Sequence, residues 1–199
     1  MHFYSWDEFN ENTKDNPPRQ LCQEAIVLVK DKNRALDVGA GALNDTKFLL
    51  TAGFAVTAID SNPSLVELAK AVHDTRLTVT SIALEDYYPP EGTFDYINAM
   101  FVLPFVGHDT FNNVFNRLYH ALAPGGIMAF QLFGDQDEWA QQPREQRFHT
   151  NMTFMNKQQV DALLANTNII KNEETLQDGP LANGDKKVWH QFNIIIKNK

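Results

Sequence analysis

The chain has 199 residues, a length typical of one globular domain. Its 25 acidic and 17 basic side chains give a formal net charge of -8, which disfavours sequence-independent binding to nucleic-acid phosphates. A single cysteine excludes an internal disulfide, and no cluster of cysteine or histidine has metal-ligand spacing, so we expect no metal. Because no apolar run is long enough to span a bilayer and no signal-peptide pattern opens the chain, we expect a cytoplasmic protein without membrane contact.

Residues 1–33 are expected to form an N-terminal arm. The first 20 residues are polar with scattered aromatic side chains, namely Phe3, Tyr4, Trp6 and Phe9. They close with Pro17-Pro18-Arg19, and spaced apolar residues then predict a helix over residues 21–30. We expect this arm to fold over the open edge of the main domain, which begins at residue 34, with an arm packed on the sheet or a disordered tail as the alternatives.

From residue 34 onward, short apolar strands alternate with helical segments. Strands are predicted over residues 35–38, 54–59, 77–82, 94–100 and 127–133. Helices are predicted over residues 44–52, from residue 62 onward, and over residues 109–122 and 156–165. Alternation of this kind is typical of an α/β fold with a parallel sheet.

The last two predicted strands cover residues 169–176 and 188–196, and the turn-rich residues 178–185 join them. Since only a loop connects these strands, they must be antiparallel neighbours. The sequence therefore predicts one domain over residues 34–199. Its expected fold is a doubly wound, Rossmann-like sheet of seven strands, mostly parallel with an antiparallel last strand.

The first strand runs into a glycine-containing turn, Asp37-Val38-Gly39-Ala40-Gly41, before the following helix. Glycine lets the backbone turn tightly and approach a ligand closely. Asp60 ends the next strand 21 residues after Gly39, where a carboxylate accepts hydrogen bonds from ribose hydroxyls. This context favours a nucleotide-like ligand over the alternative, a tight turn with a helix cap.

Acidic side chains around this turn favour a cationic ligand over a dinucleotide. A pyrophosphate requires a helix N-terminus and a third glycine, but Leu43 and Asn44 stand at that place. Asp37 and Asp45 flank the turn instead, and their carboxylates suit the ammonium and sulfonium groups of S-adenosylmethionine. Asp45 suits a helix cap equally well, and a buried Asp37 is expected to find a ligand or a backbone amide.

The segments ALDVGAG and AVTAIDSNP resemble motif I and the acidic segment after it in class I S-adenosylmethionine-dependent methyltransferases. Further segments match this class in order: LED at 84–86, FDYINA at 94–99 and LAPGG at 122–126. Within the class, the segments LPF at 103–105, FGDQDEW at 133–139 and KVWH at 187–190 are most similar to small bacterial methyltransferases of the tellurite-resistance type. Leu43 departs from the resemblance, because many members carry glycine there.

The resemblance implies S-adenosylmethionine as the cofactor and assigns a place to each matching position. At the methionine end of the cofactor we expect Asp37, Gly39, Ala40 and Gly41. At its ribose we expect Asp60, Ser61 and Asn62. Expected at the adenine are Glu85 and Asp86, with a solvated acidic loop as the alternative. Expected beside the transferable methyl are Asn98 and Ala99, with local backbone bonding as the alternative for Asn98.

Three further residues are weaker candidates. Asp135 follows the fifth predicted strand and His190 begins the last, so the topology places both at the carboxyl edge of the sheet as possible general bases. The ordinary pKa of a histidine suits a general base, although His190 would more commonly be a packing residue of the strand or core. Arg19 is expected to pair with the cofactor carboxylate through its planar guanidinium, with an arm packed on the sheet as the alternative.

The expected function is methylation of a small-molecule acceptor by direct displacement. Asn98-Ala99-Met100-Phe101 differs from the Asn-Pro-Pro-aromatic motif of amino methylation, and no Pro-Cys pair supports a covalent cytosine mechanism. We therefore expect no nucleic-acid partner. Two alternatives stay open: a Rossmann-type NAD(P)-binding oxidoreductase, and a non-catalytic cofactor-binding protein. The sequence leaves the acceptor and the oligomeric state open.

Overall fold

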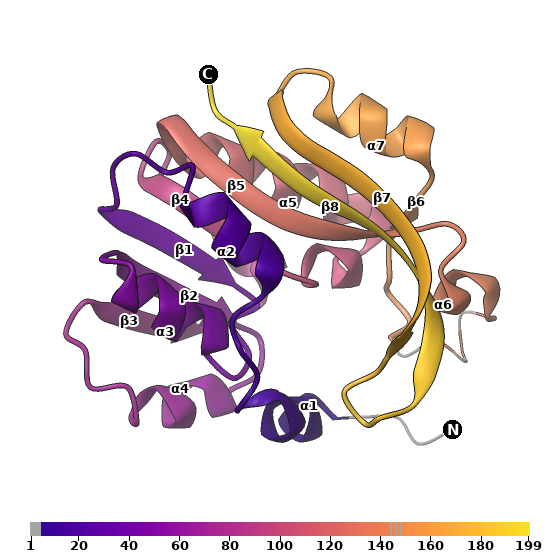
Figure 1. Ribbon diagram of the computed structural model, residues 1–199, viewed down its shortest axis with the longest axis horizontal. Coiled ribbons are helices and arrows are strands. Elements are labelled where there is room, and N and C mark those ends of the chain that lie inside the picture. The colour runs from indigo at the N-terminus through magenta and orange to yellow at the C-terminus, as the bar shows by residue number, and fades with distance from the viewer. Residues whose placement is uncertain (1–4, 144, 146, 148) are drawn as a thin grey trace.

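The computed structural model describes residues 5–143, 145, 147 and 149–199. Phe3 and Tyr4 of the expected arm lie outside the described residues. Over the described residues, one eight-stranded sheet has the order β3-β2-β1-β4-β5-β8-β7, and β6 pairs with β5 (Figure 1). The strands are β1 Arg34–Val38, β2 Ala55–Asp60, β3 Leu77–Ser81, β4 Phe94–Ala99, β5 Leu122–Gly134, β6 Phe154–Met155, β7 Asn168–Pro180 and β8 Lys186–Lys197.

The sheet confirms the predicted mostly parallel topology with an antiparallel last strand. β1 to β5 pair in parallel, whereas β8 runs antiparallel to both of its neighbours, β5 and β7. The eighth strand is the two-residue β6, which is too short for periodicity to reveal. β7 and β8 are longer than predicted, so the turn between them shrinks to residues 181–185.

Helices cover both faces of the sheet, as the doubly wound prediction requires. They are α1 Trp6–Thr13, α2 Gln20–Ile26, α3 Asn44–Thr51, α4 Ser64–Ala69, α5 His108–Ala121, α6 Glu138–Gln141 and α7 Lys157–Leu164. Apolar side chains of α2 and α3 share one core with Ala35 and Tyr96, whereas those of α5 and α7 share another with Leu36 and Ile97. Alternate residues of β1 and β4 thus point to opposite faces.

Two helix boundaries differ from the prediction. The helix predicted over residues 21–30 ends at Ile26. The helix α3 is capped by Leu43, rather than by Asn44 or Asp45, and Leu43 has φ 64°. The side chain of Asp45 instead points into the interior, where it meets polar partners described below.

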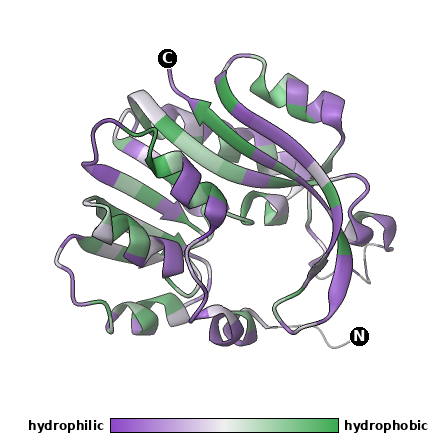
Figure 2. Cartoon of the chain, viewed as in Figure 1, coloured by the Kyte–Doolittle hydropathy of each residue, from purple (hydrophilic) through white to green (hydrophobic). Residues whose placement is uncertain are grey.

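The helix α1 was not predicted, because its sequence is almost entirely hydrophilic (Figure 2). Its stability comes from a capping box: Ser5 Oγ accepts from the Glu8 N–H, and Glu8 accepts from the Ser5 N–H. Among the described residues, no helix is both long and apolar enough to cross a membrane.

Candidate active site

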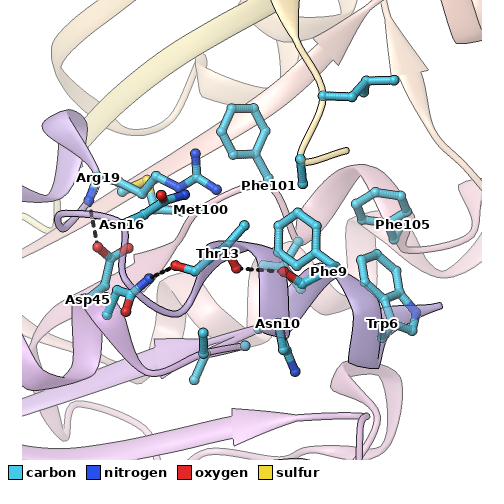
Figure 3. Close-up of a pocket in the computed structure, with 18 of the residues that line it drawn as sticks. Trp6, Phe9, Asn10, Thr13, Asn16, Arg19, Asp45, Met100, Phe101 and Phe105 are labelled. Atoms are coloured by element: carbon cyan, nitrogen blue, oxygen red, sulfur yellow. Dashed lines mark hydrogen bonds between the residues drawn. The ribbon is translucent and has the colours of Figure 1, made fainter. Parts of the chain in front are cut away.

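The carboxyl ends of the parallel strands open into a cavity of about 1140 Å³. α1 and the segment that follows it line one side, and residues of the β7–β8 hairpin line another (Figures 1 and 3). The turns after β1, β2 and β4 form its floor. Open α/β sheets bind their ligands at this edge, so the cavity is the candidate active site.

The turn after β1 brings the backbone to the cavity wall. Gly39 has φ +69°, and a Cβ there would lie 2.7 Å from the Cβ of Val102. Gly41 has φ +49° and also lines the cavity. The N–H groups of Gly39 and Ala40 both donate to the carbonyl of Ile59, at 2.8 and 3.0 Å, which ties the turn to the end of β2. Only glycine satisfies both the conformation and the space at residue 39.

Two carboxylates and one amide form a buried cluster behind this turn. Asn98 Nδ2 donates to Asp37 Oδ1 at 2.8 Å and to Asp45 Oδ2 at 3.1 Å. Thr46 Oγ1 donates to the other oxygen of Asp37 at 2.5 Å, and the Tyr96 hydroxyl donates to Asn98 Oδ1 at 2.9 Å. The expectation that a ligand or a backbone amide satisfies Asp37 is therefore wrong, since side chains of α3 and β4 do so.

Burial and mutual repulsion make this cluster electrostatically unfavourable when it is fully ionised. Desolvation, followed by the field of Asp45, raises the pKa of Asp37 to about 7. Desolvation also raises the pKa of Asp45, against the opposing hydrogen bonds from Arg19 and Asn98. Among the described residues, no ion pair includes Asp37 or Asp45. A cation in the cavity would therefore stabilise the ionised form of this cluster.

Asp60 lies at the end of β2 and also lines the cavity. Its Oδ2 accepts from the Gly41 N–H at 2.9 Å, and its Oδ1 accepts from the Asn62 N–H at 2.8 Å. Each carboxylate oxygen retains further acceptor capacity. These two hydrogen bonds fix the carboxylate beside the glycine turn, where it can accept further hydrogen bonds from a ligand.

The predicted binding residues divide into two groups. Those that line the cavity are Asp37, Gly39, Ala40, Gly41, Asp60, Ser61, Glu85, Asn98 and Arg19. The structure does not bring the others to the cavity wall: these are Asn62, Asp86 and Ala99. Asn62 instead connects α1 to α4, because its Nδ2 donates to Asp7 at 2.8 Å and its Oδ1 accepts from the Ser64 N–H.

Arg19 enters the cavity from the segment between α1 and α2 (Figure 3). Its backbone N–H donates to Asp45 Oδ1 at 2.7 Å, and its guanidinium lies over the Phe101 ring at 5.1 Å from the centroid. Among the described residues no salt bridge includes this guanidinium, although the field of Asp45 stabilises its charge. Arg19 therefore combines a fixed backbone with an available cation.

The geometry does not support the two candidate bases. His190 is 1% exposed and absent from the cavity wall. Its Nδ1 accepts from the Gln136 N–H at 3.0 Å, and its Nε2 lies 2.9 Å from Glu174. Both ring nitrogens are thus occupied, so the commoner role of a core histidine fits His190. Asp135 lies 3.6 Å from His190 and is also absent from the cavity wall.

Aromatic side chains form the part of the cavity that the sequence analysis did not predict. They are Trp6, Phe9, Phe101, Phe105, Phe133, Trp139 and Trp189. Lys187 lies among them with its ammonium 3.8 Å from the Trp189 ring centroid, and it pairs with the buried Asp137. The available signals were the aromatic residues near the N-terminus and the topology, which places Trp189 at the same edge of the sheet, whereas no pattern indicated that Trp139 would join them.

The family comparison agrees with this fold and site. Residues 35–126 match the model of a family described as a methyltransferase domain. Over this stretch, which includes the glycine turn after β1 and the acidic end of β2, the chain is similar to methyltransferases, and the sheet topology agrees with that likeness.

Particular relatives point to the same class. The chain is 31% identical over 131 residues to trans-aconitate 2-methyltransferase of Delftia acidovorans, covering 64% of this chain and 47% of that protein. It is 29% identical to the tRNA N(3)-cytidine methyltransferase METTL2 of Bos taurus, covering 59% of this chain and 34% of that one. The chain thus spans about half the length of the first of these curated relatives and less of the second.

Solved structures share the fold at low sequence identity. TehB from Haemophilus influenzae superimposes with a TM-score of 0.76 at 14% identity, covering 97% of this chain and 66% of that chain. A Burkholderia thailandensis 1,6-didemethyltoxoflavin-N1-methyltransferase, solved with S-adenosylhomocysteine, gives 0.68 at 16% identity, covering 100% and 92%. At these identities the likeness shows the fold alone.

Proposed function

We propose that this chain is an S-adenosylmethionine-dependent methyltransferase that acts on a small-molecule acceptor. The observation that carries the proposal is the Asp37–Asp45–Asn98 cluster, which holds two buried acidic side chains beside a glycine turn. Such a cluster attracts a ligand with cationic centres and repels a pyrophosphate. S-adenosylmethionine carries an ammonium and a sulfonium, and the methyl group on its sulfonium is the group transferred.

Each part of the chain has a proposed task in holding the cofactor. Asp60 accepts from the ribose hydroxyls, and Ser61 lies beside it. The backbone of residues 39–41 contacts the methionine end, where Arg19 pairs with the carboxylate. Glu85, which lines the cavity, is assigned to the adenine. Arg117 fixes the backbone of Glu85 by donating to its carbonyl at 2.8 Å. Asn62, Asp86 and Ala99 act indirectly, through the segments on which they lie.

The chain contributes alignment and exclusion of water to the reaction. Methyl transfer is a direct displacement, so holding the acceptor atom in line with the methyl group lowers the barrier. A general base is required only when the attacking atom carries a proton at that moment. The engagement of His190 with Gln136 and Glu174 therefore presents no obstacle to the proposal.

Calorimetry with S-adenosylmethionine, S-adenosylhomocysteine and NAD tests the cofactor. We expect the first two to bind and NAD to bind at least tenfold more weakly, a difference of about 1.4 kcal/mol. Binding of NAD alone would favour the oxidoreductase alternative. Binding of none of the three would contradict the proposal.

An Asp60→Ala variant tests the ribose contact. We expect it to weaken S-adenosylhomocysteine binding by about 1–3 kcal/mol, the cost of losing buried hydrogen bonds to a carboxylate. Asp95→Ala is the matched control, because Asp95 also accepts from two backbone N–H groups, those of Asn33 and Arg34 at 3.1 and 2.9 Å, outside the cavity. Equal affinities in the two variants would show that Asp60 is not the ribose ligand.

A further inference from the structure

We propose that the acceptor is an uncharged, planar heteroaromatic ring that is methylated on a ring nitrogen. The inference rests on the proposed function and names its substrate class. It derives from the aromatic chamber, by which we mean the part of the cavity lined by Trp6, Phe9, Phe101, Phe105, Phe133, Trp139 and Trp189.

The size of the cavity leaves room for a second ligand. Its volume of about 1140 Å³ exceeds the roughly 300–1,000 Å³ typical of a pocket for one small molecule. The acidic cluster, the glycine turn and Asp60 line one part, and the aromatic chamber lines the other. Phe101 lies where the two parts meet, since it follows β4 and Arg19 stacks over its ring.

The chamber is a connected series of ring contacts from segments far apart in sequence. Trp6 of α1 meets Phe105 edge-on at 5.1 Å between centroids, and Phe105 meets Phe133 at 6.1 Å. Phe133 meets Trp189 at 5.6 Å, and Phe101 meets Trp189 at 6.0 Å. Surfaces of this kind favour a flat π-system, which stacks on one ring and meets the edges of others.

The charges of the chamber disfavour a cationic acceptor. The ammonium of Lys187 lies 4.1 Å from the Trp139 centroid and 3.8 Å from that of Trp189, so the chain itself already places a cation on these two rings. Lys187 is 3% exposed, and its charge is compensated by Asp137, which is fully buried. A second ammonium here would be repelled by Lys187 and would find Asp137 already paired.

The same inventory disfavours a polyanionic acceptor. Among the described residues that line the cavity, the lysine and arginine side chains are Arg19, Lys186 and Lys187. Lys187 is paired with Asp137, and Arg19 is proposed to hold the cofactor carboxylate. One remaining lysine cannot compensate a tricarboxylate, because each unpaired buried carboxylate would cost several kcal/mol. An uncharged ring is neither repelled by Lys187 nor dependent on free cations in the cavity.

Gly179 of β7 fixes the position of the chamber wall. A Cβ at residue 179 would lie 2.8 Å from Cδ1 and 3.1 Å from Nε1 of Trp189. The indole therefore packs directly on the β7 backbone. A ring wall fixed in this way pre-organises the chamber for a flat ligand.

The proposed step balances without a co-reactant. The lone pair of an unprotonated ring nitrogen forms the new bond to the methyl carbon, and the electrons of the methyl–sulfur bond remain on sulfur. The positive charge thus passes from sulfur to the ring, which loses an N–H proton to water where it has one. No base on the chain is needed for the attack: His190 lies outside the cavity, and His149, which lines it, contacts the Phe105 ring edge-on at 6.1 Å between centroids.

The chain carries its own optical probe of the chamber, since its 3 tryptophans, Trp6, Trp139 and Trp189, all line it. The experiment titrates the full chain, with and without S-adenosylhomocysteine, with quinoline, trans-aconitate or ethanolamine at pH 8. Binding is followed by tryptophan emission, corrected for absorption by the added compound, and by calorimetry. We expect quinoline to bind and quench, and trans-aconitate and ethanolamine to do neither.

A pair of variants locates the bound ring. Phe105→Leu removes a ring that contacts both Trp6 and Phe133, and we expect about threefold to tenfold weaker quinoline binding, the worth of an aromatic contact. Phe48→Leu makes the same change at a partly buried phenylalanine outside the cavity wall, and we expect quinoline affinity to stay unchanged.

The outcomes separate this inference from the proposed function. S-adenosylhomocysteine binding without quinoline binding would overturn the inference and leave the proposed function in place, as would tighter binding of trans-aconitate or ethanolamine than of quinoline. Equal loss of quinoline affinity in both variants would also overturn it. Absence of S-adenosylhomocysteine binding would contradict the proposed function, whatever quinoline does.

Discussion

Asp37 combines complete burial at the end of β1 with an acidic neighbour. Both factors favour its protonated form and raise its pKa to about 7. In an unfolded chain the same carboxyl has an ordinary pKa near 3.8. The folded state therefore holds a proton that the unfolded state has lost between these two pH values.

This difference predicts how stability depends on pH in the ligand-free chain. The contribution of Asp37 is fully present below about pH 4 and is lost as the pH rises through about 7, by up to ~1.4 kcal/mol per pH unit. Asp37→Asn resembles the protonated form, so its stability relative to wild type should increase between pH 5 and 7. Urea unfolding at both pH values measures this, and parallel pH profiles in the two proteins would contradict it.

At the start of the helix α3, backbone strain disfavours the folded chain and side-chain packing favours it. Leu43 has φ 64°, a conformation that costs a residue with a Cβ about 1 kcal/mol or more. Its side chain is fully buried with Ala40, Ala58 and Leu65. Packing of the leucine thus offsets the strain, which explains why a residue with a Cβ is tolerated in this left-handed conformation.

Two substitutions at this residue separate strain from packing. Leu43→Ala should destabilise the chain by about 2–5 kcal/mol, because it leaves a cavity and keeps the Cβ. Leu43→Gly leaves a similar cavity but relieves the strain, so we expect it to be about 1 kcal/mol more stable than the alanine variant. Urea unfolding gives both values. Greater stability of the alanine variant, the usual order inside a helix, would contradict this account.

The strands and most helices could be predicted because their apolar residues recur with the period of the element. α1 could not be predicted that way, since only Trp6 and Phe9 give it an apolar side. Its signal was the capping box of Ser5 and Glu8, which stands before a hydrophilic segment instead of an apolar one.

The candidate site was predictable where local sequence fixes it. The glycine turn and Asp60 depend on neighbouring residues, and both line the cavity. The partners of Asp37 were not predictable, because Asn98 lies 61 residues away and meets it only through the pairing of β1 with β4. The aromatic chamber depends on the same kind of long-range pairing, between β5 and β8.

At the scale of the whole molecule, the charge of -8 bears on the choice between small and macromolecular acceptors. Binding to RNA gains most of its non-specific affinity from cations that replace counterions on phosphates. The described residues that line the cavity include three lysine and arginine side chains, one of which is already paired. We therefore propose that nucleic acid is not a partner, although one curated relative is a tRNA methyltransferase.

A filter-binding measurement with unmodified tRNA checks this proposal. At about 0.15 M salt, a physiological ionic strength, we expect no saturable binding below the roughly 10⁻⁴ to 10⁻⁶ M range of non-specific complexes. A basic protein of known tRNA affinity serves as the positive control. Saturable tRNA binding that weakens steeply with added salt would contradict the expectation.

The position of β8 between β5 and β7 also orders the assembly of the molecule during synthesis. β7 leaves the ribosome before β8 exists, and in the described sheet it has no other strand to pair with. β1 to β5, which are translated earlier, can pair with one another before the last strand exists. A growing chain can therefore complete the acidic half of its cavity first, whereas the wall that carries Trp189 closes only with the final strand.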